Sequence, residues 1–330
     1  MADPAGTTSM RRPTSGPNAG SARTLSCGAV AGLVSLALSV ACSVSAQGPS
    51  GDAARLLEGA IDVHVHSFPD SVLRSMDALQ VSQLAKTLKM RGLVLKNHYD
   101  QTAGLAYMVR QQVDDLEVFG GIDLNLTQGG MNPAAVDHMA KVSGGWGRFV
   151  WMSSSDSEHH VRTRGQNRPS VPLSRNGELL PIVKEVIGVI ARHNLVLATG
   201  HASPDEGLLL VREGKRQHVN HMIVTHPLSP SVGMSLDQMR AAAKEGALLE
   251  ICGLSMVSAG AAARVQEAAT AIRAVGAESI VLSSDLGARN DPRPPEGFGA
   301  FLLALRAAGI PEPDIDVMAK RNPARLLDLP

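Results

Sequence analysis

The stretch Leu195-Val196-Leu197-Ala198-Thr199-Gly200-His201 is an apolar run that ends in a histidine. Apolar and polar residues do not alternate in its first four positions, which is typical of a parallel strand buried on both faces. Seven other short apolar or β-branched runs occur between residues 60 and 284. We therefore expect strands at 60–64, 92–96, 117–123, 148–152, 195–200, 221–225, 247–251 and 279–284.

Amphipathic stretches separate these runs. Segments 205–214, 235–246 and 261–275 carry apolar residues at the three- and four-residue spacing of a helix. Because strands and helices alternate eight times, the sequence predicts a parallel sheet that closes into a (β/α)8 TIM barrel. The alternative is an open doubly wound sheet. A dinucleotide-binding sheet of that kind would show a glycine-rich phosphate loop after its first strand, and no such loop follows residues 60–64.

The connection after the fourth strand, residues 153–180, is longer than the others. It contains Asn176-Gly177, a dipeptide that favours a hairpin turn. Loops that follow barrel strands surround the active-site face, so this longer loop is a candidate lid or specificity element. The alternative is a solvent-exposed surface loop with no role at the active site. Two of its residues, His160 and Arg162, are candidates for substrate binding.

The first 46 residues have the three parts of a secretory signal peptide. Arg11, Arg12 and Arg23 precede an apolar run over 29–44, which ends in Val44-Ser45-Ala46. We predict a signal peptide at 1–46, a short linker at 47–59 and one catalytic domain at 60–330. Export to the periplasm or outside the cell follows, with no stable membrane insertion after cleavage. A retained membrane anchor and lipid attachment at Cys42 are the alternatives.

Cysteine and charge content restrict the class of protein further. Cys27 and Cys42 lie in the targeting segment, so the mature chain keeps only Cys252 and can form no internal disulfide. Lys and Arg number 31, and so do Asp and Glu, so the chain lacks the basic excess typical of nucleic-acid-binding proteins. We expect a small-molecule substrate, and the sequence leaves the oligomeric state open.

Residues of the kind that bind metals stand at the ends of four predicted strands. His64 and His66 end the first, and because residues two apart on a strand face the same side, both should face the barrel axis at its C-terminal mouth. The others are His201, His226 and Asp285, at the ends of strands five, six and eight. Imidazole and carboxylate suit a divalent metal, Zn²⁺ first of all, at one or two sites. For any one histidine a packing role competes, and for Asp285 a helix N-cap.

This order of ligands resembles the metal-dependent amidohydrolase superfamily. The closing Asn322-Pro323-Ala324-Arg325-Leu326-Leu327 is also common there. The phrases Val94-Leu95-Lys96-Asn97-His98, Gly120-Gly121-Ile122-Asp123-Leu124-Asn125 and Ser284-Asp285-Leu286-Gly287 are similar to an uncharacterised amidohydrolase-like branch, a domain of unknown function. The match runs from about residue 60 to the end. It implies a barrel and a metal site without naming a substrate.

One departure from the family concerns the bridging ligand. Many members carry a carboxylated Lys or a Glu on strand four, where this chain has Phe149-Val150-Trp151-Met152-Ser153. Lys96, at the end of strand two, is the candidate substitute as a metal-bridging carbamate. It could equally bind an anionic substrate or oxyanion as a cation, and a structural role is the third alternative. His98 lies two residues on and could contact metal or substrate, or simply pack.

The residues suggest a mechanism in which Asp285 is the catalytic base that orients the attacking water and accepts its proton. We interpret Glu250 and Asp123 as partners of the ligating histidines and Cys252 as an inert buried thiol. The leading hypothesis is hydrolysis of a C–N or C–O bond in a cyclic amide, ester or lactone. Phosphoester cleavage and mononuclear decarboxylation are the alternatives. A non-catalytic exported metal-binding module is a further one, although such a module would need no base beside its metal.

Overall fold

The computed structural model describes residues 51–257 and 261–330. The predicted signal peptide at 1–46 and the lipid-attachment candidate Cys42 lie outside the described residues. Helix α1 (Gly51–Leu57) lies within the segment that we expected to be a linker, and it packs its buried Leu56 and Leu57 against the domain. No helix of the described part is long and apolar enough to cross a membrane.

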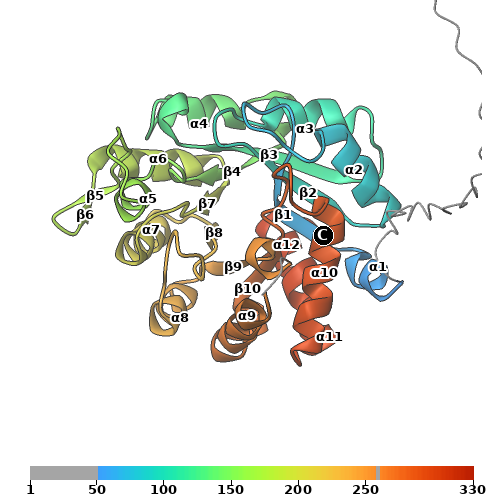
Figure 1. The fold of residues 1–330 in the computed structure, drawn as a ribbon. Coiled ribbons are helices and arrows are strands. Elements are labelled where there is room, and N and C mark those ends of the chain that lie inside the picture. Colours follow the sequence, from blue (N-terminus) through green and yellow to red (C-terminus); the bar gives the residue numbers. More distant parts are fainter. Residues whose placement is uncertain (1–50, 258–260) are drawn as a thin grey trace, which may run out of the picture. The chain divides into compact units, whose positions relative to one another are not determined.

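Eight parallel strands form one sheet in the order β1-β2-β3-β4-β7-β8-β9-β10. This order follows the chain, and helices connect successive strands around the sheet, so the predicted (β/α)8 barrel is confirmed (Figure 1). The strands are β1 (Ile61–His66), β2 (Gly92–Lys96), β3 (Glu117–Asp123), β4 (Gly147–Trp151), β7 (Val196–Ala198), β8 (His221–Val224), β9 (Leu248–Cys252) and β10 (Ile280–Ser283).

Hydrogen bonds between β1 and the segment just after β10 join the two ends of the sheet. The amide of Asp285 donates to the carbonyl of His64, and the amide of His66 donates to the carbonyl of Leu286, each at 2.9 Å. The buried carboxylate of Asp62 spans the same seam, since its Oδ1 accepts from the amides of His64 (3.2 Å) and Ser284 (2.9 Å). Three predicted ligands therefore belong to the seam that closes the barrel.

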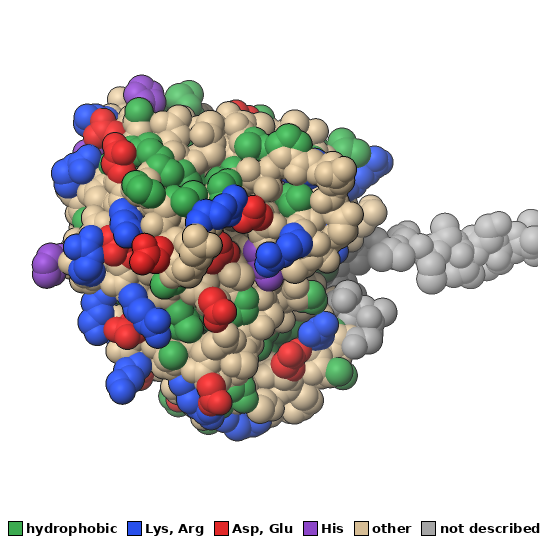
Figure 2. Space-filling model, turned by 90° about the vertical axis from the view of Figure 1, so that its left-hand side faces the viewer, with side chains coloured by type: hydrophobic (Ala, Val, Ile, Leu, Met, Phe, Trp, Pro, Cys, Tyr) green, Lys and Arg blue, Asp and Glu red, His purple; other side chains and the backbone are tan. Residues whose placement is uncertain are grey.

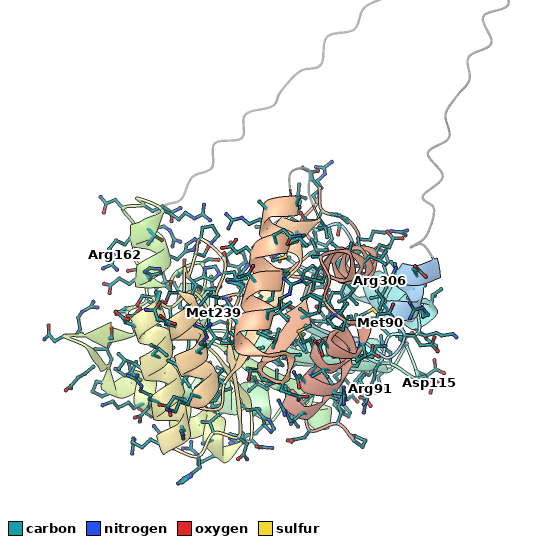
Figure 3. All side chains as sticks on the ribbon, turned by 90° about the horizontal axis from the view of Figure 1, so that it is seen from below. Met90, Arg91, Asp115, Arg162, Met239 and Arg306 are labelled. Carbon is teal, nitrogen blue, oxygen red and sulfur yellow. The ribbon has the colours of Figure 1, made fainter. Side chains whose placement is uncertain are left out.

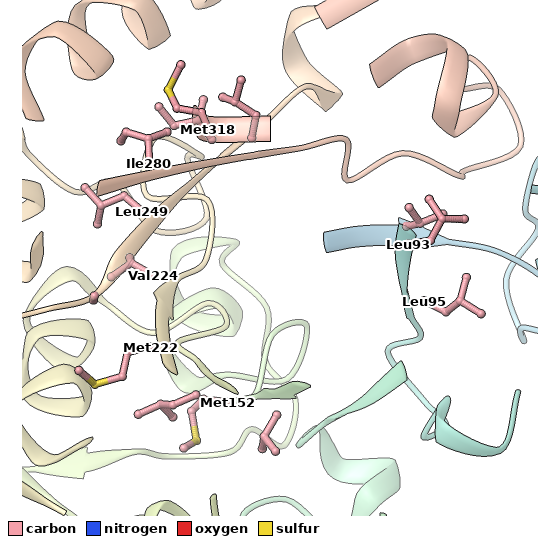
Figure 4. Close-up of a cluster of buried hydrophobic side chains, with 14 of the residues drawn as sticks. Leu93, Leu95, Met152, Met222, Val224, Leu249, Ile280 and Met318 are labelled. Atoms are coloured by element: carbon pink, nitrogen blue, oxygen red, sulfur yellow. The ribbon is translucent and has the colours of Figure 1, made fainter. Parts of the chain in front are cut away.

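The hydrophobic core has two layers. Inside the barrel, Ile61, Phe119, Phe149, Trp151 and their neighbours pack together, and Leu326 and Leu327 of the C-terminal tail cover this layer. Between barrel and helices lies a larger layer, part of which is drawn in Figure 4. The helices are α2 (Ala78–Thr87), α3 (Ala103–Arg110), α4 (Pro133–Ala140), α6 (Pro181–Arg192), α7 (Pro204–Arg216), α8 (Leu236–Lys244), α9 (Ala262–Val275), α10 (Pro294–Ala307) and α11 (Glu312–Asp316).

The tail motif has a structural role. A π-helical turn (Val317–Arg321) leads into α12 (Asn322–Leu326). The buried side chain of Asn322 donates to the carbonyls of Ala277 (2.9 Å) and Ile280 (2.7 Å), at the start of β10. The amide of Asn322 thus ties the tail to the last strand, at the end of the barrel opposite the mouth.

The longer loop after β4 contains helix α5 (Glu158–Thr163) and the small hairpin β5 (Ser174–Arg175) and β6 (Glu178–Leu179). The predicted turn at Asn176-Gly177 is confirmed, and both residues have positive φ, as a tight hairpin requires. The hydroxyl of Ser157, the N-cap residue of α5, donates to the carbonyl of His201 at 2.7 Å. This bond fixes α5 next to the end of β7.

Candidate metal centre

Two groups of side chains meet at the C-terminal mouth of the barrel. In the first group, His64 and His66 from the end of β1 both point their Nε2 atoms at Oδ1 of Asp285, at 3.0 and 3.3 Å. Both imidazoles are buried, and their rings lie 5.2 Å apart. The three side chains are close enough for one cation to contact all of them.

A break in strand register turns His64 toward this group. Ile61 and Val63 face the barrel interior, whereas Val65 packs in the outer layer. Strict alternation from Val63 would direct His64 outward, but the pairing of β1 with β2 shifts between Asp62 and Val65. The shift gives Val63 and His64 the same side, so both histidines reach the mouth.

Glu250 on β9 positions His64 from behind. Its Oε1 lies 3.0 Å from Nδ1 of His64 and accepts a hydrogen bond from the hydroxyl of Ser283 at 2.8 Å. Burial lowers the pKa of His64, but the carboxylates of Asp285 and Glu250 outweigh burial and the opposing Lys96, and raise this pKa to about 9. The proton on Nδ1 is held by Glu250, so Nε2 is the atom that a metal would contact.

Asp285 occupies a strained backbone position. Its φ of +54° is uncommon for a residue other than glycine, and such positions persist where the surrounding structure enforces them, often at functional sites. Two residues on, Gly287 has a φ of +134°, and a Cβ there would lie 2.0 Å from the carbonyl oxygen of His66. Burial raises the pKa of Asp285, but His64, with His66 and His226, holds it well below its usual range. The carboxylate is therefore ionised at neutral pH.

The second group consists of histidines. Nε2 of His201, which follows β7, lies 3.2 Å from Nε2 of His226, which follows β8. The Nδ1 atoms of His201 and His160 are 3.0 Å apart. Burial, reinforced by the neighbouring His226, lowers the pKa of His201 well below its usual value, and burial lowers the pKa of His226 to about 4 despite Asp285 and Glu250. Both imidazoles are neutral, the state that binds metals.

Backbone geometry again brings these ligands together. Gly200 has a φ of +61°, and a Cβ there would lie 1.8 Å from the carbonyl oxygen of Met152. Only glycine fits this close approach, which ends β7 at Ala198 rather than at residue 200 as predicted. His226 itself has a φ of +25°. The two groups adjoin, since the rings of His64 and His226 lie 6.0 Å apart.

Lys96, at the end of β2, lines the same cleft as members of both groups. Its side chain is 1% exposed, its Nζ has no hydrogen-bond partner among the described residues, and Oδ2 of Asp123 lies 3.7 Å away. The ring of Trp151 on β4 lies 5.1 Å from Nζ. His98 also lines this cleft, with its Nδ1 3.1 Å from Oδ2 of Asp123. Burial lowers the pKa of His98.

These side chains line a cleft of about 460 Å³. His66, Lys96, His98, His160, His201, His226 and Asp285 are all on its walls. Arg162 is not. His160 and Arg164 are four residues apart and share one face of the α5 turn, whereas Arg162 is exposed on another face, at the periphery of the molecule in Figure 3. The structure therefore places Arg164, rather than the predicted Arg162, at the cleft.

Sequence reasoning missed several lining residues, among them Arg74, Ser229 and Ser231. Arg74 lies in the β1–α2 connection and pairs with Asp70 at 2.6 Å. The two serines follow His226 in the β8–α8 loop. None of the three ends a strand, so the rule that located the histidines could not find them. Cys252 is buried beside Ser283, and burial, followed by the charges of Glu250 and Asp285, raises its pKa well above the usual value, in keeping with an inert thiol.

The residues present fit a divalent metal. Four buried nitrogens at the site have no hydrogen-bond partner in the described structure: Nε2 of His64, Nδ1 of His66, Nδ1 of His226 and Nζ of Lys96. Buried polar atoms without partners are costly and rare in protein interiors. Imidazoles that converge on an ionised carboxylate are the donor set that zinc and neighbouring divalent metals select. A metal bound at Nε2 of His64 would take the place of the proton that the nearby carboxylates favour there.

Known structures share this barrel. An amidohydrolase from Pseudomonas aeruginosa aligns with a TM-score of 0.58 at 11% identity, over 84% of this chain and 98% of that chain. A zinc-bound amidohydrolase from Burkholderia multivorans gives 0.56 at 12% identity, over 82% and 99%. A 2,6-dihydroxybenzoate decarboxylase from Rhizobium gives 0.53 at 13%, over 82% and 99%. At these identities the likeness concerns the fold, which is that of the amidohydrolase-type barrels, as the motifs predicted.

The family to which the chain belongs is more specific than this shared fold. Residues 59–250 match the model of a family of unknown function, DUF6282. The chain belongs to this family, in agreement with the uncharacterised branch that its motifs resemble. No curated protein matches the sequence.

Proposed function

We propose that the protein is a metal-dependent hydrolase that cleaves a C–N or C–O bond in a small molecule such as a cyclic amide, ester or lactone. One observation carries this proposal: His64 and His66 converge on one oxygen of an ionised Asp285, beside the His201–His226 pair, in a cleft at the barrel mouth. Active sites of this barrel type lie at that face.

In the proposed mechanism, residues of this chain bind the metal, accept the proton of the attacking water and hold these side chains in position. A divalent cation, when bound, lowers the pKa of water and polarises a substrate oxygen. Asp285 receives both imidazoles at Oδ1, which leaves Oδ2 to accept the proton of the attacking water. Glu250 holds His64 in the tautomer whose Nε2 faces the metal. We propose zinc, which suits this donor set and is bound in the Burkholderia multivorans amidohydrolase.

Lys96 has two roles that fit its position. Addition of CO₂ to its neutral amine would form an N–C bond, release a proton and give a carbamate, which is an acidic ligand between the two histidine groups. As an unmodified cation it would instead stabilise negative charge on the substrate. Electron density at Lys96 in metal-loaded crystals, or reactivation by bicarbonate after acid treatment, separates the two roles.

Decarboxylation is the second candidate. The observation in its favour is that β4 has no acidic residue to act as a second anionic ligand and ends in the buried Trp151. The decarboxylase from Rhizobium has this barrel. Phosphoester cleavage would use the same residues as amide or ester hydrolysis, so only the choice of substrate separates those two.

The test is a screen of purified, zinc-loaded protein with lactones, cyclic amides, esters, phosphoesters and aromatic acids, alongside metal analysis. We expect about one or two metal ions per chain and metal-dependent hydrolysis that is lost in Asp285→Asn. Folded protein that binds no metal would overturn the proposal. Release of CO₂ without hydrolysis would replace it with decarboxylation.

We propose in addition that the chain is exported and cleaved after Ala46, on the strength of its N-terminal pattern. N-terminal sequencing of the protein recovered from the cell envelope or medium tests this. A mature chain beginning at Gln47 is expected, whereas a lipid-modified Cys42 would show lipoprotein processing instead.

A further inference from the structure

The cleft is lined by more basic than acidic side chains. Among the lining side chains, Arg74, Lys96 and Arg164 are basic, and Asp285 and Asp291 are acidic. Asp285 faces His64 and His66. Asp291 uses its Oδ2 to accept from the amides of Gly287 and Ala288. Within the described residues, neither carboxylate forms an ion pair with Arg74, Lys96 or Arg164.

The three cations differ in how they are engaged. Arg74 is nearly buried, and Asp70 accepts from its Nε at 2.7 Å and lies 2.6 Å from one terminal nitrogen. Lys96 is buried, and Oδ2 of Asp123 lies 3.7 Å from its Nζ. Arg164 stands on the rim, and its guanidinium has no hydrogen-bond or ion-pair partner in the described part of the chain, whereas nearby Arg168 is bound to Asp156. The guanidinium of Arg164 is therefore available to bind an anionic ligand in the cleft.

Neutral donors complete the rim around Arg164. If Nε2 of His201 binds metal, its Nδ1 carries the proton and donates to Nδ1 of His160, 3.0 Å away. His160 then carries its own proton on Nε2, where it is a donor that lines the cleft. Ser229 and Ser231 from the β8–α8 loop line the same cleft. A guanidinium together with imidazole and hydroxyl donors is a recognition site for an anionic oxygen pair.

We propose that the substrate carries a carboxylate, which Arg164 binds at the rim of the cleft, with His160 and the loop serines as neutral donors, while the scissile bond lies at the metal ligands. This inference rests on the proposed function, because it treats the cleft as the substrate site. A single unpaired guanidinium matches the single charge of a carboxylate, whereas a phosphate dianion would call for further cations.

Binding of a probe to the zinc-loaded full chain tests the inference. Benzoate and the neutral, equally large benzamide are titrated by calorimetry into the unaltered protein and into the Arg164→Ala and Arg162→Ala variants. Arg162→Ala is the matched control, because it removes the same charge from the same short segment outside the cleft. We expect Arg164→Ala to weaken benzoate binding about 10- to 100-fold, the usual contribution of a hydrogen bond to a charged group. Arg162→Ala should leave it unchanged.

The outcomes separate this inference from the proposed function. Benzoate that binds equally to the Arg164→Ala variant is held by the metal alone, and that result overturns the inference even if hydrolysis is found. Stronger binding of phenylphosphonate than of benzoate would also overturn the assignment of a carboxylate. Arg164-dependent benzoate binding in a protein that hydrolyses nothing would uphold the anion site while the proposed hydrolase function fails.

Discussion

The two histidine groups at the barrel mouth are built differently. The His64–His66–Asp285 group contains a carboxylate, has Glu250 behind it and belongs to the hydrogen-bonded seam between β1 and β10. Among the described residues, the side chain within hydrogen-bond distance of the His201–His226 pair is a third imidazole, that of His160, and both members of the pair follow strands on loop backbone. Because a dication is held best where ligand charge offsets its own, we expect the first group to bind a metal more tightly than the second. The second group consists of imidazoles, and we expect an added or shared acidic ligand to strengthen its binding.

The largest effect should come from the carboxylate of the first group. Asp285→Asn removes the proton acceptor while its remaining oxygen can still bind metal, so we expect turnover to fall about 10²- to 10⁴-fold. Metal content and kcat measured together check this. Loss of metal with loss of turnover would show that Asp285 acts mainly as a ligand, and full activity would remove it from the mechanism.

Removal of the metal should show which of the two histidine groups accounts for the metal-dependent thermal stability of the protein. A metal present at about 1,000 times its dissociation constant stabilises the fold by roughly 4 kcal/mol, which raises the melting temperature on the order of 10 °C. We expect a chelator to remove this increment from the unaltered protein. His64→Ala should abolish the metal-dependent shift, and His201→Ala should keep most of it. The reverse pattern, read by differential scanning fluorimetry, would make the second group the primary site.

The backbone that carries the second group gives a prediction of intermediate size. Gly200→Ala forces a Cβ against the carbonyl of Met152 at a positive φ, so we expect a loss of about 2–4 kcal/mol in unfolding free energy. Gly233 also has a positive φ, +75°, but open space around its Cβ position, so Gly233→Ala should cost only about 1 kcal/mol. Equal losses in urea denaturation would show that the close approach to Met152 is unimportant.

The smallest effect concerns support behind the first group. Glu250→Gln should lower metal affinity roughly 10- to 100-fold, because His64 loses the carboxylate that fixes its tautomer. The matched control is Glu185→Gln, on an exposed position of α6. Competition with a metal-binding dye measures both variants. An unaltered affinity in Glu250→Gln would mean that the charge of Glu250 is not needed, because the glutamine oxygen can still accept from Nδ1 of His64.

Sequence patterns predicted the strands well because a parallel barrel buries both faces of each strand. β2 and β3 have the predicted bounds, and β4 and β9 begin one residue away from theirs. The clustering of His64, His66, His201, His226 and Asp285 also followed from a simple rule: strand ends meet at one mouth. Whether each residue binds metal stays a prediction. β7 was predicted too long because the sequence did not show that Gly200 leaves the strand.

Features that depend on loop conformation could not be predicted from the sequence. The register shift that turns His64 inward is a pairing irregularity with no signature in Asp62-Val63-His64. Selecting Arg164 over Arg162 required knowing that residues 158–163 form a helix and which of its faces meets the cleft. Arg74 and Ser231 arrive from connections whose paths are fixed by packing, so their side chains could not be assigned to the site in advance.

The hydrogen bonds between β1 and the segment after β10 also affect when the site forms during folding. The hydroxyl of Ser284 donates to the carbonyl of His64 across 220 residues of chain, and Asp285 follows directly. Contacts so distant in sequence form late, after loop closure has been achieved. A chain that has emerged only as far as β9 holds His64, His66, His201 and His226 but lacks both the closing strand and the carboxylate. If the first group binds metal as proposed, we expect tight binding only once the barrel has closed, so the rate of metal uptake during refolding would report the rate of that closing step.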